Sequence, residues 1–322
     1  MYTQSQTDIL KNISRIGIIP VIAIDDAAKA VSLAKALADG GLPAAEVTFR
    51  TAAAEDAIRA IAREVPDMLL GAGTVLTRDQ VDRALDAGCA FLVSPGFNPE
   101  LTAYAIGKGA LMIPGTKTPG EMEQAMAIGL EVVKFFPAEL SGGVSFLKAV
   151  AGPYKHLKWM CTGGINARNV SEYLSFDQIT ACGGTWMFQK GSENLIKTEN
   201  WEEITRICKE AVRIMLGFEI RHIGIHCPNS GKTEHIAQRI SELFSFDFQT
   251  GNFSGIACSL DAAKGKQGQI TIATNSVERG VYQLERRGVK FVPETAVVKD
   301  GKLMDICIAE SFGGFAVRLI QK

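Results

Sequence analysis

The sequence contains no long apolar run and no excess of charge of either sign. None of its hydrophobic stretches approaches the roughly 20 residues that a membrane-spanning helix needs, so no membrane partner is expected. The 34 Lys and Arg residues balance 35 Asp and Glu residues, for a net charge of −1. Nucleic acids and anionic membranes are bound by clustered positive charge, so neither is predicted as a ligand.

Two further absences concern the compartment. The seven cysteines are odd in number and include no C-x-x-C pair, a usage typical of a reducing compartment. Residues 1–15 lack the apolar core of a signal peptide. We therefore expect a cytoplasmic location. A chain of 322 residues with 47% hydrophobic residues is long enough for two globular domains.

Eight strand–helix units recur between residue 16 and about residue 215. Helical patterns with an Ala-rich face follow the apolar runs, and glycines at 40, 41, 88, 109 and 129 stand where helices should end. Near-continuous apolar strands indicate parallel strands buried on both faces. The pattern predicts a closed (β/α)₈ TIM barrel over residues 1–216. An open doubly wound sheet is the alternative, but no dinucleotide fingerprint follows the first strand. The predicted strands are 16–24, 44–49, 68–73, 90–96, 111–115, 131–136, 158–164 and 179–184.

Polar residues at the strand ends are candidates for chemistry, because barrel active sites lie at the carboxyl ends of the strands. Glu46 falls inside the second strand and Arg50 closes it. Thr74 closes the third strand and Pro95 ends the fourth.

Lys134 is the least expected of these residues, since it interrupts the apolar sixth strand between Val133 and Phe135. Burial disfavours the charged ammonium and lowers the pKa of a lysine, and a neutral amine can attack a carbonyl. The alternatives are that Lys134 points outward or forms a buried ion pair with Glu46.

Glycine pairs follow the seventh and eighth strands, in TGGIN (162–166) and ACGGT (181–185). Backbone N–H groups in such loops, together with a helix N-terminus, can bind phosphate, and Thr185 adds a hydroxyl. The alternative is that the glycines only make tight turns. Cys161 and Cys182 beside these loops are interpreted as small core residues.

Six segments together resemble the 2-keto-3-deoxy-6-phosphogluconate aldolases, also described as 4-hydroxy-2-oxoglutarate aldolases. The likeness runs in order over residues 10–215. It implies a pyruvate-forming class I aldolase on a (β/α)₈ barrel that needs no metal or other cofactor, with a 2-oxo acid as its small-molecule substrate. It also implies a homotrimer. The segments are AAEVTFRT (44–51), GAGTVL (71–76), SPGF (94–97), KFFPAE (134–139), TGGI (162–165) and CGGTW (182–186).

The resemblance also implies a role for each matching residue. Lys134 would form the Schiff base and Glu46 would be the general acid and base. Arg50 and Thr74 would lie near the pyruvate carboxylate, and Lys117 in PGTKTPGE (114–121) is a departure with no assigned role. The remaining substrate-binding residues would be Pro95 and Phe136 in the pocket, Thr162 and Gly183, and, around a phosphate, Gly163, Gly164, Gly184 and Thr185, the last standing where a serine is frequent.

The last part of the chain, residues 217–322, is predicted to be a smaller α+β domain of two βαβββ repeats. This pattern resembles the vicinal oxygen chelate fold of the glyoxalase and bleomycin-resistance proteins. The resemblance places His222 at the first metal-ligand position, Gln269 at the next and Arg318 where a glutamate is usual. Since Gln is a poor ligand and Arg is none, we expect no metal here, and instead a binding, oligomerisation or regulatory role.

Three functions remain open from the sequence. The leading one is the class I aldolase, a lyase. The second is a non-catalytic sugar-phosphate-binding barrel, and the third makes the C-terminal domain the working enzyme and the barrel an assembly platform. The glycine loops favour a phosphorylated substrate, but both candidate substrates share the pyruvate half.

Overall fold

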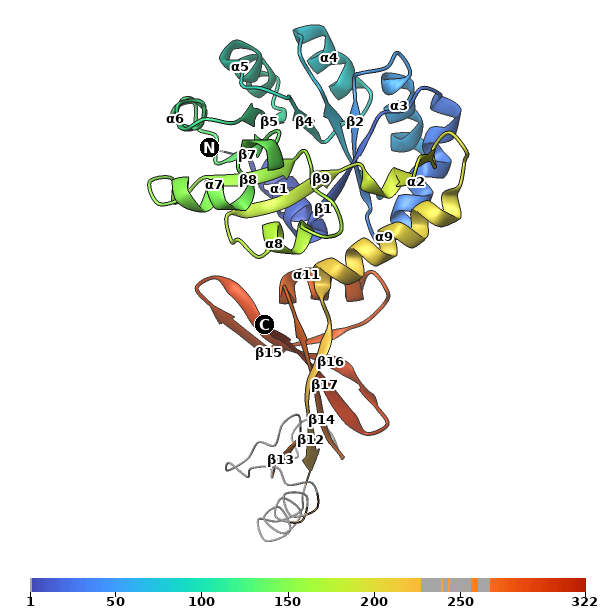
Figure 1. The fold of residues 1–322 in the computed structure, drawn as a ribbon, viewed down its shortest axis with the longest axis vertical. Helices are drawn as coiled ribbons and strands as arrows, with labels where there is room; N and C mark the ends of the chain where they lie inside the picture. Colours follow the sequence, from blue (N-terminus) through green and yellow to red (C-terminus); the bar gives the residue numbers. More distant parts are fainter. Residues whose placement is uncertain (1, 227–238, 240–242, 244–255, 260–266) are drawn as a thin grey trace. The chain divides into compact units, whose positions relative to one another are not determined.

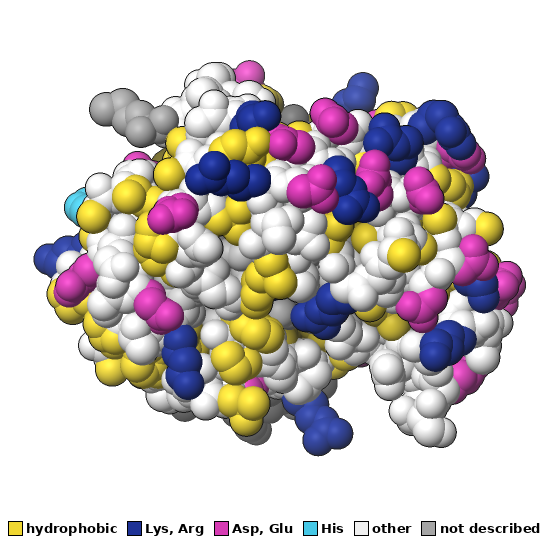
Figure 2. Space-filling model, turned by 90° about the horizontal axis from the view of Figure 1, so that it is seen from above, with side chains coloured by type: hydrophobic (Ala, Val, Ile, Leu, Met, Phe, Trp, Pro, Cys, Tyr) yellow, Lys and Arg dark blue, Asp and Glu magenta, His cyan; other side chains and the backbone are white. Residues whose placement is uncertain are grey.

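The computed structural model describes residues 2–226, 239, 243, 256–259 and 267–322. The chain divides into two compact units, Met1–Met215 and Leu216–Lys322. Figure 1 shows helices arranged around the sheet of the first unit. Among the described residues, no helix has the length and apolarity needed to cross a membrane. On the face drawn in Figure 2, acidic and basic side chains are interspersed among apolar ones, as the balanced charge predicts.

The first unit is built on parallel strands in the order β5-β4-β3-β2-β1-β9-β8-β7-β6. Only Pro114 separates β5 from β6, and a proline has no N–H for a strand ladder. The two pieces are therefore one interrupted strand, and the order closes on itself as an eight-stranded barrel. The strands are β1 (Ile18–Ile22), β2 (Ala44–Thr48), β3 (Leu69–Gly73), β4 (Phe91–Val93), β5 (Leu111–Ile113), β6 (Gly115–Thr116), β7 (Val132–Phe135), β8 (Lys158–Thr162) and β9 (Ile179–Gly184).

Helices follow most of these strands, and several begin and end with the expected local signals. Capping boxes at Thr3, Thr77 and Thr118 satisfy free N–H groups at three helix starts. Glycines 41, 88, 109 and 129 have positive φ just beyond helix ends, as predicted. The helices are α1 (Gln4–Ile16), which was not predicted, α2 (Ala30–Asp39), α3 (Ala54–Glu64), α4 (Arg78–Asp86), α5 (Pro99–Gly107), α6 (Pro119–Ala127), α7 (Gly143–Val150), α8 (Val170–Leu174) and α9 (Trp201–Leu216).

The connections after the last two barrel strands differ from the expectation of regular helices. The helix after β8, α8, has five residues, and β9 is followed by the three-residue 3₁₀ helix η3 (Trp186–Phe188). A short hairpin, β10 (Gln189–Lys190) and β11 (Glu193–Asn194), then leads to α9. Two other 3₁₀ turns are η1 (Ala27–Lys29) and η2 (Glu139–Ser141).

The second unit is a six-stranded mixed sheet in the order β13-β12-β14-β17-β16-β15. Helix α11 packs on it through a core of Val277, Ile306 and Leu319. The order β14-α11-β15-β16-β17 matches the predicted second repeat, whereas the predicted helix 232–246 and strand 247–252 lie outside the described residues except at 239 and 243. The elements are β12 (Glu219–His226), β13 (Ile256–Ser259), β14 (Gly268–Thr274), α11 (Val277–Glu285), β15 (Phe291–Lys299), β16 (Lys302–Phe312) and β17 (Phe315–Gln321).

Candidate active site

A lysine and a glutamate meet inside the barrel. Lys134 lies on β7 and Glu46 on β2, and their side chains approach so that Nζ is 3.1 Å from Oε1 and 3.5 Å from Oε2. Lys134 is 5% exposed and Glu46 is 1% exposed. Lys134 therefore points inward, and the ion pair raised as an alternative is present. A buried pair of this kind is also the arrangement that a proton transfer between the two groups requires.

Small residues on the neighbouring strands make room for this pair. Glu46 lies beside Gly71 in the ladder between β2 and β3. A Cβ atom added to Gly73 would lie 2.3 Å from Glu46 Oε1. On the other side of the barrel, a Cβ atom on Gly115, which pairs with Lys134, would lie 2.1 Å from the Pro95 carbonyl oxygen. Glycine is thus required at both positions for the carboxylate and the Pro95 backbone to stand where they do.

Phe136 and Pro95 lie close to the pair. The Lys134 Nζ is 5.4 Å from the centroid of the Phe136 ring, within the range of a cation–π contact. Pro95 follows the end of β4, and its carbonyl contacts Gly115 next to Lys134.

Arg50 and Thr74 come together just beyond the ends of β2 and β3. Arg50 Nε donates to Thr74 Oγ1 at 3.2 Å. This bond uses one of the five guanidinium N–H donors of an exposed arginine. Thr74 has φ of 57°, which is a strained conformation for a β-branched residue and is found most often at functional sites. A guanidinium and a hydroxyl are suitable donors for a carboxylate.

The Thr162 hydroxyl is buried without a partner. Thr162 ends β8, in register with Gly183 on β9, and is 7% exposed. Within the described part of the chain its Oγ1 makes no hydrogen bond. Thr162 is two residues from Met160, which pairs with Lys134, so it faces the same side of the sheet as the lysine. A buried hydroxyl without a partner costs about 1–3 kcal/mol, and this one lies on the same side of the sheet as Lys134.

The predicted phosphate loops are open turns. Gly163 and Gly164 have φ of 102° and 83°, and neither amide N–H donates to another group in the part of the chain that the structure describes. Gly184 lies against the Trp186 ring, and Thr185 is exposed. The helix N-terminus expected at these loops is not formed, because α8 begins only at Val170 and η3 is a single 3₁₀ turn.

Other residues that the sequence singled out lie apart from this centre. Lys117 is exposed, and its N–H donates to Glu121 as part of the cap of α6. Cys161 and Cys182 are buried, and burial raises the pKa of the Cys161 thiol well above its usual value. These two cysteines are core residues, as interpreted from the sequence.

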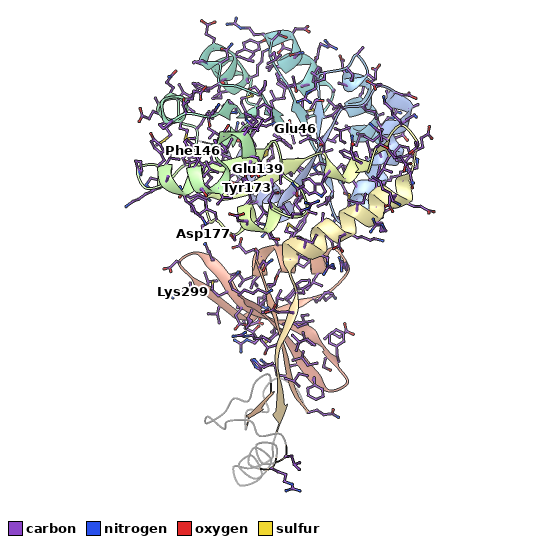
Figure 3. All side chains as sticks on the ribbon, viewed as in Figure 1. Glu46, Glu139, Phe146, Tyr173, Asp177 and Lys299 are labelled. Atoms are coloured by element: carbon purple, nitrogen blue, oxygen red, sulfur yellow. The ribbon has the colours of Figure 1, made fainter. Side chains whose placement is uncertain are left out.

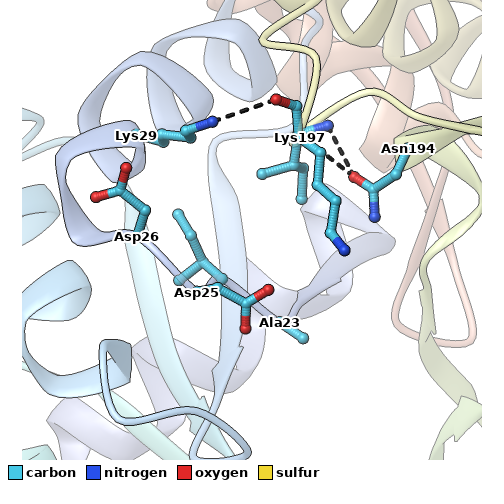
Figure 4. Close-up of a pocket in the computed structure, with 8 residues that line it drawn as sticks. Ala23, Asp25, Asp26, Lys29, Asn194 and Lys197 are labelled. Atoms are coloured by element: carbon cyan, nitrogen blue, oxygen red, sulfur yellow. Dashed lines mark hydrogen bonds between the residues drawn. The ribbon is translucent and has the colours of Figure 1, made fainter.

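A pocket beyond the end of β1 was missed by the sequence reasoning (Figure 4). Lys29 Nζ donates to the Lys197 carbonyl across it at 3.2 Å. The only sequence signal was the pair of aspartates after the first strand. The lining residues are Ala23, Ile24, Asp25, Asp26, Lys29, Asn194, Ile196 and Lys197.

In the second unit, three polar residues form a row across adjacent strands. His222 on β12 pairs with Thr271 on β14, which pairs with Arg318 on β17. His222 Nε2 is 3.0 Å from Thr271 Oγ1, and Arg318 is bound to Asp305. Thr271 is the residue of β14 that lies beside His222, and the Gln269 amide donates to Thr271 Oγ1 at 3.1 Å.

Comparison with known proteins identifies the first unit. The family model described as KDPG and KHG aldolase matches residues 9–207. The chain belongs to this family. A 2-dehydro-3-deoxy-phosphogluconate aldolase of Haemophilus influenzae is 44% identical over 214 residues, which are 66% of this chain and 99% of that protein. A KHG/KDPG aldolase of Escherichia coli is 40% identical over 195 residues, covering 61% of this chain and 90% of its own.

Solved structures of family members agree with the barrel. The 2-keto-3-deoxy-6-phosphogluconate aldolase of Zymomonas mobilis with 3-phosphoglycerate is 37% identical, with a TM-score of 0.58 over 63% of this chain and 94% of that one. The KDPG aldolase of Legionella pneumophila, with pyruvate captured as a covalent carbinolamine, is 36% identical. Its TM-score is 0.60, and the match covers 65% of this chain and 98% of that one. The predicted activity is confirmed: this chain is a class I aldolase, and the doubly wound sheet is excluded.

Proposed function

We propose that this KDPG and KHG aldolase family member cleaves 2-keto-3-deoxy-6-phosphogluconate to pyruvate and glyceraldehyde 3-phosphate through a Schiff base on Lys134. Cleavage of 4-hydroxy-2-oxoglutarate to pyruvate and glyoxylate is the second candidate reaction. The observation that carries the proposal is the buried approach of Lys134 Nζ to Glu46 Oε1 at 3.1 Å. Lys134 supplies a nucleophile and Glu46 a proton acceptor at one point inside the barrel. The sequence of this barrel is similar to those of proteins named for these substrates.

The chemistry follows from the amine and the carboxylate. Glu46 accepts a proton from the Lys134 ammonium, and the free amine adds to the C2 carbonyl of the substrate. Glu46 returns that proton to the hydroxyl of the resulting carbinolamine, which leaves as water and gives an iminium ion. The iminium accepts the electron pair of the C3–C4 bond as that bond breaks. Glu46 takes the proton of the C4 hydroxyl, the aldehyde leaves, and the remaining enamine is protonated at C3 by Glu46. Water then hydrolyses the iminium to pyruvate and the Lys134 ammonium, which restores the starting pair with Glu46.

Arg50 and Thr74 would hold the carboxylate of the substrate. Their bond to each other at 3.2 Å leaves the guanidinium with further donors for a bidentate contact. Fixing the carboxylate orients the C2 carbonyl toward Lys134, which lowers the entropic cost of the first step. Pro95 and Phe136 would form the apolar wall around the pyruvate half.

The distal half of the substrate would lie along β8 and β9. The unpartnered Thr162 hydroxyl would bind a substrate hydroxyl, with Gly183 leaving the space for it. The N–H groups of Gly163 and Gly164, with Gly184 and Thr185, would bind the phosphate as loop donors. Remote binding of a phosphate positions the aldehyde half for cleavage, and this favours the phosphorylated substrate.

For residues 217–322 we propose a vicinal oxygen chelate fold, supported by the order β14-α11-β15-β16-β17 and by the parallel pairing of β14 with β17. The row of His222, Thr271 and Arg318 offers one good metal ligand, so a binding, oligomerisation or regulatory role is proposed instead. A homotrimer and a cytoplasmic location, both expected from the sequence, remain predictions.

The test of the proposed reaction is pyruvate release from each substrate, measured with a lactate dehydrogenase coupled assay. We expect both substrates to be cleaved, with the higher kcat/KM for the phosphorylated one. Glu46→Gln keeps the shape of the side chain but not the base, and should lower kcat by roughly 10²–10⁴-fold. Absence of pyruvate from both substrates would refute the proposal.

A further inference from the structure

We propose that Glu139 and Tyr173 form a brace that positions the Gly163–Gly164 loop for the substrate phosphate and so determines the preference for a phosphorylated substrate. The inference rests on the proposed function. Glu139 ends the KFFPAE segment, in which Lys134 and Phe136 already have roles and Glu139 has none. Tyr173 lies on α8, beyond the glycine loop. Figure 3 shows both side chains, and they are in direct hydrogen-bond contact.

The backbone of the loop after β7 holds the backbone of the loop after β8. The Ala138 N–H donates to the Thr162 carbonyl at 2.8 Å, and the Glu139 N–H donates to the Gly163 carbonyl at 3.0 Å. These bonds continue the ladder between β7 and β8 past the ends of both strands. The position of Glu139 therefore fixes the position of the glycine loop.

The side chain of Glu139 packs under the same loop. A Cβ atom on Gly164 would lie 2.5 Å from Glu139 Cγ and 2.6 Å from its Cβ. The aliphatic part of Glu139 thus occupies the space beside the Gly164 backbone. Any rotation of this side chain would change the room available to the loop.

Tyr173 fixes the rotamer of Glu139. Its hydroxyl donates to Glu139 Oε1, and its side chain is 1% exposed. Burial first, and then the neighbouring carboxylate, raise the pKa of Tyr173. The hydroxyl consequently remains protonated and keeps donating throughout the physiological range of pH. A hydrogen bond from a buried donor to a charged acceptor is among the stronger kinds.

The carbonyl of Gly164 is bound by two asparagine side chains. Asn166 Nδ2 and Asn169 Nδ2 donate to it at 3.0 Å and 3.1 Å. The carbonyls of residues 162, 163 and 164 are therefore all bound, whereas the N–H groups of Gly163 and Gly164 have no partner in the described part of the chain. A loop with its carbonyls fixed and its N–H groups available is a preorganised anion site.

The test compares the two substrates in Tyr173→Phe, which removes only the hydroxyl. The KM for 2-keto-3-deoxy-6-phosphogluconate should rise about tenfold, the effect of losing one hydrogen bond of about 1.4 kcal/mol. The KM for 4-hydroxy-2-oxoglutarate, which carries no phosphate, should stay the same, as should kcat for both. Glu139→Gln keeps an acceptor for Tyr173 and should show a smaller rise, whereas Glu139→Ala should reproduce the effect of Tyr173→Phe.

The chain offers a matched control. Tyr154 also donates to a carboxylate, Glu123 Oε1 at 2.9 Å, but it precedes β8 and so lies toward the opposite end of that strand. Tyr154→Phe should leave both KM values unchanged. Inorganic phosphate as a competitive inhibitor should bind more weakly to Tyr173→Phe and equally well to Tyr154→Phe.

The outcomes distinguish a failure of the proposed brace from a failure of the proposed aldolase function. Equal losses on both substrates in Tyr173→Phe, or no loss on either, would overturn the brace while leaving the aldolase proposal intact. If the unmodified chain releases no pyruvate from either substrate, the proposed function itself fails. If Tyr173→Phe does not fold, Glu139→Ala decides: a selective rise in KM for the phosphorylated substrate supports the brace, and any other result refutes it.

Discussion

Lys134 and Glu46 are buried groups that form an ion pair with each other. Burial of either group alone would be costly, and their contact offsets part of that cost. The pair also leaves the amine and carboxylate beside Phe136 rather than in water. Formation of the imine with a substrate carbonyl would therefore replace the ion pair between Lys134 and Glu46.

The first prediction concerns the space around Glu46. Gly73→Ala places a Cβ atom 2.3 Å from Glu46 Oε1, so the carboxylate has to move away from Lys134. Displacing a catalytic group by about 1 Å costs on the order of 10²-fold in kcat. Steady-state kinetics provide the measurement. The control is Gly107→Ala, whose added Cβ meets no atom within 4 Å; similar kinetics for the two variants would contradict the account.

The second prediction concerns the hydroxyl without a partner. Thr162→Val removes the unpaired Oγ1 and keeps the shape, so the melting temperature should stay the same or rise. Loss of the contact to a substrate hydroxyl should lower kcat/KM about tenfold. Thermal unfolding and kinetics on the same preparation separate these effects. A variant that loses stability but keeps kcat/KM would show that Thr162 has only a structural role.

At the residue level, the sequence singled out Lys134 because a lysine is unexpected in an apolar strand, whereas its ion pair with Glu46 was only one of the alternatives. The unpaired state of Thr162 could not be predicted, since it depends on which atoms of neighbouring strands approach it. Glu139 and Tyr173 were missed for a related reason: their contact joins η2 and α8, which follow different strands.

At the scale of elements, the strands were predictable because a buried parallel strand is a continuous apolar run. The interruption of the fifth strand at Pro114 was not predicted. The short α8 was not predicted either, because a glycine-rich loop can be followed by a regular helix or by a single turn. In the second unit, the residue of β14 that lies beside His222 could not be predicted, because it depends on the register of the two strands. A bulge between Ile220 and His222 shifts the pairing of β12 with β14, and one such shift moves a different residue beside His222.

The third prediction concerns the sheet of the second unit. Burial lowers the pKa of His222 below its usual value, with smaller contributions from the positive charges of Arg221 and Arg318. The unfolded chain therefore binds a proton more readily than the folded sheet. The stability from the neutral ring is present above about pH 6.5 and is lost as the pH falls below that value.

Urea unfolding of the full chain at several pH values between 7.5 and 5 measures this effect. His222→Gln should show a smaller loss of stability on acidification than the unmodified chain. His156→Gln changes an exposed histidine of the first unit and should leave the loss unaltered. An unchanged pH dependence in His222→Gln would contradict the assigned role.

At the scale of the whole molecule, the aldolases compared above match the barrel but not the second unit. The match to the Haemophilus influenzae aldolase takes in 99% of that protein but 66% of this chain. The family resemblance therefore accounts for the activity of the first unit alone. The second unit has its own helix-covered core, which is a property of an independent domain.

The fourth prediction follows from this division. A chain ending at residue 217, after α9, should fold and keep kcat/KM for pyruvate release within about threefold of the full chain, because a domain with its own core can fold alone. Size-exclusion chromatography of the two forms would show whether the second unit affects assembly. Loss of activity in a well-folded short chain would show that the second unit contributes to catalysis.

The most direct test of the central claim is borohydride trapping with pyruvate, followed by intact mass measurement and peptide mapping of the full chain. The account predicts one reduced pyruvate adduct on Lys134 that is absent from Lys134→Ala. Lys117→Ala changes an exposed lysine and should be trapped to the same extent as the unmodified chain. No adduct, or an adduct on another lysine such as Lys117, would contradict the Schiff-base assignment.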